Sequence, residues 1–224
     1  MSRIWPSKTK KRSKQVRLKM EKISEFTVRR LSNYYRILLD LEKRGITTVS
    51  SHRLAELGGI TSAQVRKDLS YFGNFGTRGL GYSVSELKAQ IVQILGLDHK
   101  WNMALFGAGS LGHALFFHQG FRDDGFYFKH VFDVDGSKVG QKWNDVTITH
   151  QRLAEETLRR DPVNIAVVAT PPEAAADVVA LLVRSGIKGI LNFAPTQLTV
   201  PDGVWLRNVN LAVALESLSF YLSM

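Results

Sequence analysis

The chain of 224 residues contains no cysteine. Without a thiol it can form no disulfide, use no cysteine nucleophile and bind no cysteine-ligated zinc or iron–sulfur cluster. Any redox response must therefore come through a bound cofactor. No apolar run approaches the roughly 20 residues that a membrane helix needs, and residues 1–22 lack the apolar core of a signal peptide. We expect a cytoplasmic protein with no membrane segment.

Positive charge is concentrated toward the amino terminus. The net charge is +10, to which residues 1–22 contribute +8, residues 23–100 contribute +4 and residues 101–224 contribute −2. A basic amino-terminal part before a slightly acidic remainder is typical of a nucleic-acid-binding module joined to a domain with another task. We expect residues 1–23 to form a basic flexible arm; a solvated arm with no specific role is the alternative.

The spacing of apolar residues after this arm predicts a helix-turn-helix. A first helix is expected from Thr27 to Arg44, with a buried face made of Val28, Leu31, Tyr35, Leu38 and Leu41. A short helical run over residues 54–57 follows, and Thr61 begins a third helix that extends to Phe72. Thr61 and Gln64 have the spacing of a capping box, in which Gln64 returns a hydrogen bond to the Thr61 backbone.

The third helix has the composition of a DNA-recognition helix. Val65, Leu69 and Phe72 form its buried stripe, which leaves a small residue, two cations and a hydroxyl on the outer face. Small residues allow close approach, and Arg or Lys can donate to guanine or to phosphate. The predicted DNA contacts are Ala63, Gln64, Arg66, Lys67, Ser70 and Tyr71.

A glycine-rich stretch, residues 73–82, follows the third helix. Four glycines and two aromatic residues predict a β-wing that presents Arg78 to the minor groove or to phosphate. A flexible interdomain loop is the alternative. A further helix over residues 83–97 would close the amino-terminal domain.

The second half of the chain carries the fingerprint of a dinucleotide-binding site. An apolar strand over residues 102–106 precedes a GxGxxG loop, and a second strand ends at Asp133, about 21 residues after Gly112. The loop residues are Gly107, Ala108, Gly109, Ser110, Leu111 and Gly112. In this motif Gly107 makes the tight turn, Gly109 lets the pyrophosphate approach the backbone, and Gly112 lets helix and strand pack closely.

Two acidic residues predict which dinucleotide binds. Asp133 and Asp135 can accept hydrogen bonds from the adenosine ribose and would repel a 2′-phosphate, so NADH and NAD⁺ are the expected cofactors. Helices over residues 151–160 and 173–185 and strands over residues 165–169 and 189–191 continue the alternating pattern. Loops at the carboxyl ends of the two strands add predicted cofactor contacts, with ordinary turns as the alternative: Thr170, Pro171, Asn192, Phe193 and Ala194.

The last segment, residues 211–222, is apolar on several sides. A surface helix would not be apolar all round, so we expect it to be buried in a second subunit; packing on its own domain is the alternative. A two-fold homodimer would also match an operator with two half-sites.

The predicted fold class is therefore α/β. Residues 24–98 form a winged helix-turn-helix domain, residues 99–208 a Rossmann-like doubly wound parallel sheet, and residues 209–224 a helix for dimerisation.

Several strings within residues 24–222 resemble the Rex redox-sensing transcriptional repressors: RRLSNYYRILLDLEKRGI, TVSSHRLAELGGI, AQVRKDLSYFGNFGTRGLGY, GAGSLG, FDVD, GIKGILNFAP and LESLSFYL. The resemblance implies a homodimer whose carboxy-terminal helix is swapped between subunits, and which binds double-stranded operator DNA and leaves it when NADH replaces NAD⁺. It also implies a switching role for Arg36. Two positions depart from the family pattern: His118 replaces a common tyrosine and Asn210 a common aspartate. A neutral Asn210 offers only ordinary hydrogen bonds, so we expect an altered NADH response.

Parts of the sequence also suggest two other functions. An NAD-dependent oxidoreductase needs a positioned acid or base, but His113 and His118 have no evident carboxylate partner in the sequence, so no catalytic residue is expected. A regulator that binds coenzyme A or another adenine nucleotide is suggested by GILNFAP. The preferred prediction is a repressor that senses the NADH/NAD⁺ ratio and uses no metal.

Overall fold

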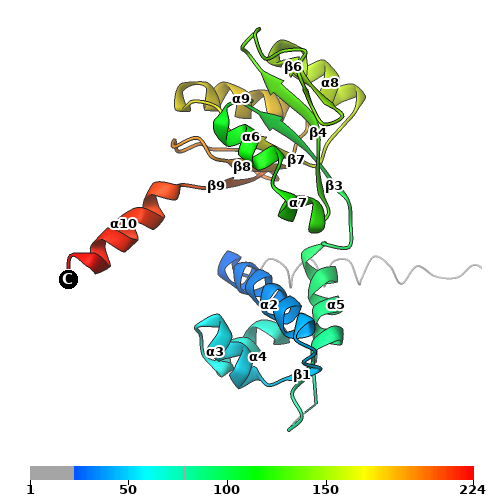
Figure 1. The fold of residues 1–224 in the computed structure, drawn as a ribbon, viewed down its shortest axis with the longest axis vertical. Helices are drawn as coiled ribbons and strands as arrows, with labels where there is room; N and C mark the ends of the chain where they lie inside the picture. Colours follow the sequence, from blue (N-terminus) through cyan, green and yellow to red (C-terminus); the bar gives the residue numbers. More distant parts are fainter. Residues whose placement is uncertain (1–22, 78) are drawn as a thin grey trace, which may run out of the picture. The chain divides into compact units, whose positions relative to one another are not determined.

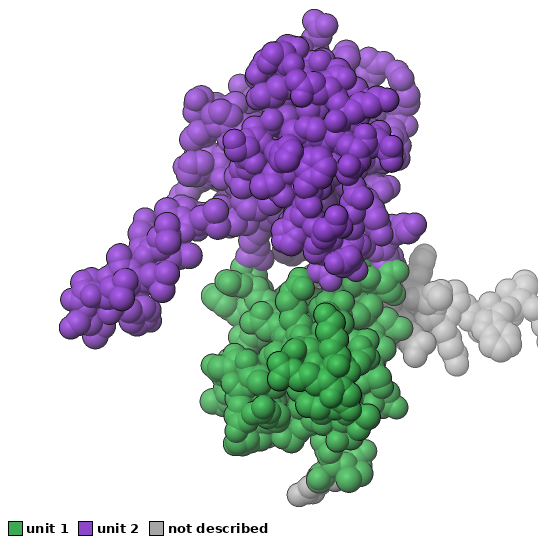
Figure 2. Space-filling model, viewed as in Figure 1, with its two compact units in different colours: residues 1–98 green, residues 99–224 purple. Residues whose placement is uncertain are grey.

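The computed structural model describes residues 23–77 and 79–224. Residues 1–22 of the predicted basic arm (1–23) and the predicted wing contact Arg78 lie outside the described residues. The chain divides into two compact units, residues 1–98 and residues 99–224 (Figure 2). Each unit has its own hydrophobic core. No helix within the described ranges is long and apolar enough to cross a membrane.

Unit 1 is a winged helix-turn-helix. Its elements in chain order are α2 (Glu25–Lys43), β1 (Thr48–Val49), α3 (Ser51–Gly58), α4 (Ser62–Ser70), β2 (Tyr82–Ser83) and α5 (Val84–Leu95) (Figure 1). A hydroxyl caps the amino end of each helix, as Ser24, Ser50, Thr61 and Ser83 each accept a backbone N–H three residues on. β1 and β2 pair antiparallel, and a bridge between Thr77 and Gly81 lies in the wing.

The core of unit 1 confirms most of the predicted apolar face of α2. Leu31, Leu38 and Leu41 are buried together with residues of α4 and α5. The prediction for Val28 is wrong, because its side chain is 43% exposed. Tyr34, rather than Tyr35, is the buried tyrosine of this helix, and its hydroxyl donates a hydrogen bond to a carboxylate on α4. Helical spacing alone could not distinguish two adjacent tyrosines whose burial depends on a distant partner.

Unit 2 contains a seven-stranded sheet with the order β5-β6-β4-β3-β7-β8-β9. The strands are β3 (Trp101–Phe106), β4 (Phe126–Asp133), β5 (Lys142–Trp143), β6 (Val146–His150), β7 (Ile165–Val168), β8 (Gly189–Asn192) and β9 (Trp205–Asn208). Every pair is parallel except β5 with β6. The parallel strands, numbered along the chain, have the order 3-2-1-4-5-6, which is the doubly wound order of dinucleotide-binding sheets. The predicted Rossmann-like fold is confirmed.

Helices cover both faces of this sheet. Side chains alternate along β3, so that Ala104 and Phe106 join one cluster with α8 (Ala154–Arg160) and α9 (Pro172–Arg184). Met103 and Leu105 join the opposite cluster with α6 (Ser110–Phe116), and Phe121 of α7 (Gln119–Asp123) packs against it. The predicted helix over residues 151–160 is in two parts, because a 3₁₀ turn over residues 151–153 precedes α8.

The last helix, α10 (Leu211–Leu222), is solvent-exposed along its whole length. It follows β9 and extends away from the sheet of its unit (Figure 1). Its exposed large apolar side chains are Leu211, Val213, Leu215, Leu218, Phe220, Tyr221 and Leu222. The alternative in which this helix packs on its own domain is therefore wrong, and the chain leaves an apolar helix without a partner.

Candidate DNA-binding surface and nucleotide crevice

The outer face of α4 is made of the predicted residues. Ala63, Arg66, Lys67 and Ser70 are exposed, whereas Val65 and Leu69 are buried. The Arg66 guanidinium donates to Ser51 Oγ at the start of α3, with an N–O distance of 3.1 Å. This contact joins the outer faces of the two helices. Gln64 and Tyr71 are half-buried at the margin of the face.

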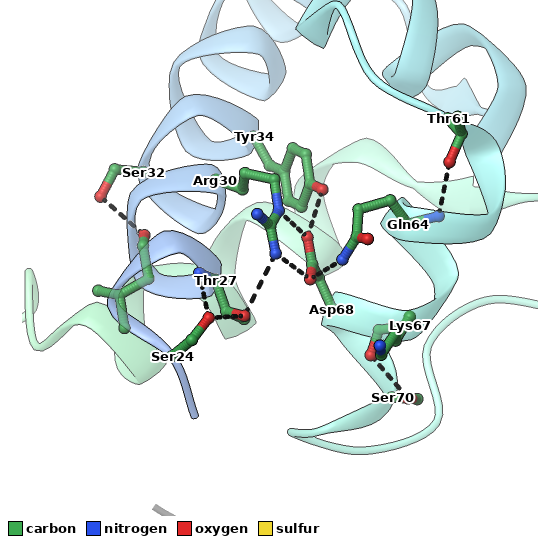
Figure 3. Close-up of polar contacts among 11 residues, drawn as sticks. Ser24, Thr27, Arg30, Ser32, Tyr34, Thr61, Gln64, Lys67, Asp68 and Ser70 are labelled. Carbon is green, nitrogen blue, oxygen red and sulfur yellow. Dashed lines mark hydrogen bonds and ion pairs between the residues drawn. The ribbon is translucent and has the colours of Figure 1, made fainter. Parts of the chain in front are cut away.

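A buried carboxylate, which was not predicted from the sequence, lies under this face. Asp68 on α4 is fully buried. Its Oδ2 accepts from Arg30 Nε at 2.6 Å and from the Tyr34 hydroxyl at 2.8 Å, and its Oδ1 accepts from Arg30 Nη2 and Gln64 Nε2 at 2.7 Å each (Figure 3). Arg30 and Tyr34 come from α2, so the carboxylate joins α2 to α4. The signal was available, because Asp68 stands three residues after Val65 on the buried stripe.

The partners of Asp68 keep it ionised. Burial by itself raises the pKa of a carboxyl group, but hydrogen bonds from Arg30, Tyr34 and Gln64 outweigh burial and hold the pKa of Asp68 below its ordinary value. Burial, and next the hydrogen bond to Asp68, raises the pKa of Tyr34. The Arg30 guanidinium forms an ion pair with Asp68 and compensates its negative charge.

The same network corrects the capping-box prediction. Thr61 Oγ1 does accept from the Gln64 backbone N–H, at 3.2 Å. The Gln64 side chain, however, donates to Asp68 rather than to the Thr61 backbone. The charged acceptor makes the stronger bond, so the predicted return bond is wrong.

The glycine loop of unit 2 lies where the strand order reverses, at the carboxyl end of β3 between β4 and β7. Gly107 has φ +100°, and a Cβ there would lie 2.5 Å from the Ala169 carbonyl oxygen. A Cβ at Gly112 would lie 1.9 Å from the Gly107 carbonyl oxygen. At Gly109 a Cβ would meet nothing within 4 Å. Two glycines are therefore required by close backbone packing, while the third faces open space of the kind a phosphate could fill.

Asp133 holds this loop in place. Its carboxylate is buried at the end of β4, where Oδ2 accepts from the Ala108 N–H at 2.6 Å and Oδ1 from the Asp135 N–H at 2.8 Å. Lys138 Nζ lies 3.5 Å from Oδ2. Each carboxylate oxygen can accept more than one hydrogen bond, so Asp133 keeps acceptor capacity for a ribose hydroxyl. Asp135 is exposed and accepts from the Ser137 hydroxyl and N–H, which lowers the pKa of Asp135.

The loops after β7 and β8 lie at the same carboxyl edge of the sheet as the glycine loop. This edge, made of the loops after β3, β7 and β8, is the candidate nucleotide crevice, because ligands bind there in doubly wound sheets. Thr170 Oγ1 is buried and has no hydrogen-bond partner among the described residues. A buried hydroxyl without a partner costs about 1–3 kcal/mol, so this group is suited to a polar ligand atom. Pro171 is exposed beside it. The Asn192 amide, by contrast, is fully buried and bonded within the protein, so direct contact with a cofactor would cost one of its bonds. Phe193 is half-buried and Ala194 buried.

The three residues assigned to switching have local positions that the sequence did not reveal. Arg36 is exposed on α2. His118 is the N-cap of α7: its Nδ1 accepts from the Gly120 N–H at 3.1 Å and its ring stacks on Phe121. Asn210 is the N-cap of α10, where Oδ1 accepts from the Ala212 N–H at 2.9 Å. The cap bonds give His118 and Asn210 a structural role. The switching role of Arg36, His118 and Asn210 stays a prediction.

Family models match both units. The model described as "Putative DNA-binding protein N-terminus" matches residues 22–70, and the model described as "CoA binding domain" matches residues 98–196. A helix-turn-helix unit joined to a Rossmann-like unit with an open glycine loop defines a ligand-responsive DNA-binding protein.

Curated relatives identify the family. The chain is 53% identical, over 89% of its length and 96% of the relative, to a redox-sensing transcriptional repressor Rex of Carboxydothermus hydrogenoformans. It is 48% identical to the Rex repressor of Syntrophomonas wolfei, over 92% of its length and 99% of the relative. The chain belongs to the Rex family of redox-sensing transcriptional repressors. These relatives are named as repressors and not as enzymes, which supports the expected regulator over the oxidoreductase.

Solved structures agree with this assignment. A Rex-family repressor named RSP, in complex with NAD⁺ and operator DNA, matches with a TM-score of 0.86 and 39% identity, covering 89% of this chain and 92% of RSP. RSP in complex with NADH matches with a TM-score of 0.84 and 37% identity, covering 90% of this chain and 94% of RSP. The likeness extends over both units.

Proposed function

We propose that this protein is a transcriptional repressor that binds operator DNA through unit 1 and senses the NADH/NAD⁺ ratio through unit 2. It binds the operator when NADH is low and is released when NADH binds. The observation that carries the proposal is the presence, in one chain of the Rex family, of a cationic helix-turn-helix face and an open GxGxxG crevice. The protein acts on DNA in the cytoplasm.

On the DNA side, α4 enters the major groove with Arg66 and Lys67 outward. Ala63 allows close approach, Ser70 and Tyr71 lie at the margins, and Arg78 comes from the wing. Because the Gln64 amide nitrogen is bonded to Asp68, Gln64 offers DNA its carbonyl oxygen, an acceptor suited to adenine N6 or cytosine N4.

On the nucleotide side, the loop over residues 107–112 takes the pyrophosphate, which passes over the open position at Gly109. Asp133 and Asp135 accept from the adenosine ribose, and the Thr170 hydroxyl gains a polar partner. The cofactor differs between its two states in the charge and shape of the nicotinamide ring, and no hydride leaves it here. NADH shifts the equilibrium between DNA-bound and DNA-free protein because it binds these two states with different affinities.

The working unit is a homodimer. Every residue of α10 is exposed, and an apolar helix of this kind is stable in water only when another surface covers it. A second copy of the chain supplies that surface and places two α4 helices on two half-sites.

Fluorescence anisotropy with the operator duplex of the RSP complex tests the proposal. At fixed salt, saturating NADH should weaken binding by about tenfold or more, within the usual range of allosteric coupling, while NAD⁺ should leave the duplex bound. Salt must be fixed because phosphate contacts make affinity salt-dependent. Binding that responds to neither nucleotide would show that the protein is not a sensor of this ratio.

A further inference from the structure

Asn192 lies at the carboxyl end of β8, and its side-chain amide makes several hydrogen bonds within the protein. Its Oδ1 accepts from the Ala194 N–H at 3.0 Å, and its Nδ2 donates to the Ala194 carbonyl at 3.0 Å and to Asn208 Oδ1 at 2.9 Å. The side chain is fully buried. One amide therefore fixes both the loop after β8 and the end of β9.

The other end of this connection is the base of α10. Asn208 is the last residue of β9, directly opposite Asn192 in the parallel register. The next residue, Val209, donates its N–H to the Asn192 carbonyl at 2.8 Å. Asn210 then caps α10. Since α10 is exposed throughout and β9 is the edge strand, the bonds to Asn192 are the last attachment of the chain to the sheet before α10 begins.

The loop held by Asn192 belongs to the crevice. The Phe193 N–H donates to the carbonyl of Val168, the last residue of β7, at 2.8 Å. Thr170, with its unpaired buried hydroxyl, is two residues beyond Val168. A ligand that contacts the loops after β7 and β8 would therefore press on the backbone of residues 193 and 194. The N–H and the C=O of Ala194 are both bonded to the Asn192 amide.

We propose that the Asn192–Asn208 amide pair is a positioning element that couples occupation of the crevice to the orientation of α10. The inference rests on the proposed function, because it assigns NADH to the crevice. In this proposal the pair acts through the protein and not by contact with the cofactor. It passes a displacement of the loop over residues 193–194 to residues 208 and 209, and so to the first turn of α10. Packed elements with few alternative arrangements transmit small shifts of this kind.

Substitutions at Asn208 can distinguish an effect on coupling to α10 from an effect on the stability of the fold. This residue is exposed, and its side chain supplies only an acceptor to Asn192. Asn208→Ala removes the acceptor, and Asn208→Asp keeps it. Asn164→Ala removes an exposed amide acceptor of the same kind, which accepts from the Asn102 N–H at the opposite edge of the sheet, and is the matched control. For each full-length variant, operator affinity is measured by anisotropy with and without saturating NADH, and NADH affinity is measured without DNA.

The wild-type protein and Asn208→Asp should show the same NADH-dependent loss of operator affinity. In Asn208→Ala the ratio of operator affinity without NADH to operator affinity with NADH should fall at least about threefold, a measurable part of a typical coupling factor. NADH affinity without DNA should change less than twofold. Asn164→Ala should keep the wild-type ratio. If the amide pair only stabilises the fold, Asn208→Ala should lower the melting temperature and leave this affinity ratio unchanged. That result would overturn the inference.

Hydrogen exchange in the unmodified protein gives a test that needs no substitution. NADH should change the exchange rate of the Val209 amide at least about threefold, because its acceptor is the Asn192 carbonyl. An unchanged Val209 rate with NADH bound would overturn the inference even if Asn208→Ala failed to fold. If the wild-type protein binds NADH but keeps its DNA, the proposed function fails instead, and the Val209 rate still reports on the coupling.

Discussion

Arg30 and Asp68 form a two-point ion pair between α2 and α4, with N–O distances of 2.6 and 2.7 Å. The carboxylate is fully buried, and about a quarter of the guanidinium side chain is exposed. The proposed recognition helix, α4, is therefore fixed by a charged contact on its inner side. Its angle to α2 determines where Arg66 and Lys67 point, although neither member of the pair has to touch DNA.

Asp68→Asn should lower operator affinity by about tenfold, which corresponds to about 1.4 kcal/mol, and should leave the salt dependence of binding unchanged. The reason is that the substitution loosens the position of α4 without removing a phosphate contact. Anisotropy at several salt concentrations measures both quantities. NADH affinity, determined in unit 2, is the control and should stay at the wild-type value.

The same substitution should reduce stability, because it leaves Arg30 without its counter-charge. Removing one partner of a buried pair costs about 3–5 kcal/mol, and the partial exposure of Arg30 places this case at the lower end. Tyr34→Phe removes one hydrogen bond and keeps the ion pair, so it should cost only about 1–2 kcal/mol. Urea unfolding measures both values, and an equal loss of unfolding free energy in Asp68→Asn and Tyr34→Phe would contradict this ranking.

Acid should weaken unit 1 through Asp68. The pKa of Asp68 is lowered in the folded protein, so its contribution is fully present above the ordinary carboxyl pKa of about 3.9 and is lost as pH falls toward the folded-state pKa. Urea unfolding at pH 6 and pH 3 should show the wild-type protein losing more stability than Asp68→Asn. Parallel losses in the two proteins would mean that Asp68 does not titrate differently on folding.

Lys67 is expected to contact phosphate or a base edge from the exposed face of α4. Lys67→Ala should reduce operator affinity and also lower the magnitude of the slope of log K against log salt by about 0.9, the value for one phosphate contact. Lys188→Ala removes the same charge from an exposed position in unit 2 and should change neither. A wild-type slope in Lys67→Ala, with lowered affinity, would assign Lys67 to a base instead of a phosphate.

Much of this architecture could be predicted because its signals are local. The last helix was predicted with its observed bounds, Leu211–Leu222, and Asp133 was predicted at the end of its strand. Features that depend on distant partners were missed. β9 and the two-residue strand β5 carry little pattern of their own and form by pairing with neighbouring strands. The burial of Asp68 likewise depends on Arg30, which lies 38 residues earlier.

The glycine loop gives a prediction with an internal comparison. Gly112→Ala would place a methyl group 1.9 Å from a carbonyl oxygen, so it should destabilise unit 2 by about 1–3 kcal/mol and weaken NADH binding. Gly109→Ala meets no protein atom within 4 Å and should keep the wild-type melting temperature, yet weaken NADH by about tenfold through contact with the pyrophosphate. Undiminished NADH affinity in Gly109→Ala would show that the pyrophosphate takes another path.

The exposed leucines of α10 predict an assembly that a single charge would break. Leu211, Leu215, Leu218 and Leu222 lie on one side of the helix at spacings of three and four. Burial of a leucine contributes about 2 kcal/mol, so Leu218→Glu should raise the dissociation constant of the dimer at least about 30-fold. Sedimentation velocity measures this directly. Ser217→Glu adds the same charge off the leucine side and should remain dimeric; a Leu218→Glu protein that also stayed dimeric would place the subunit contact elsewhere than on this stripe.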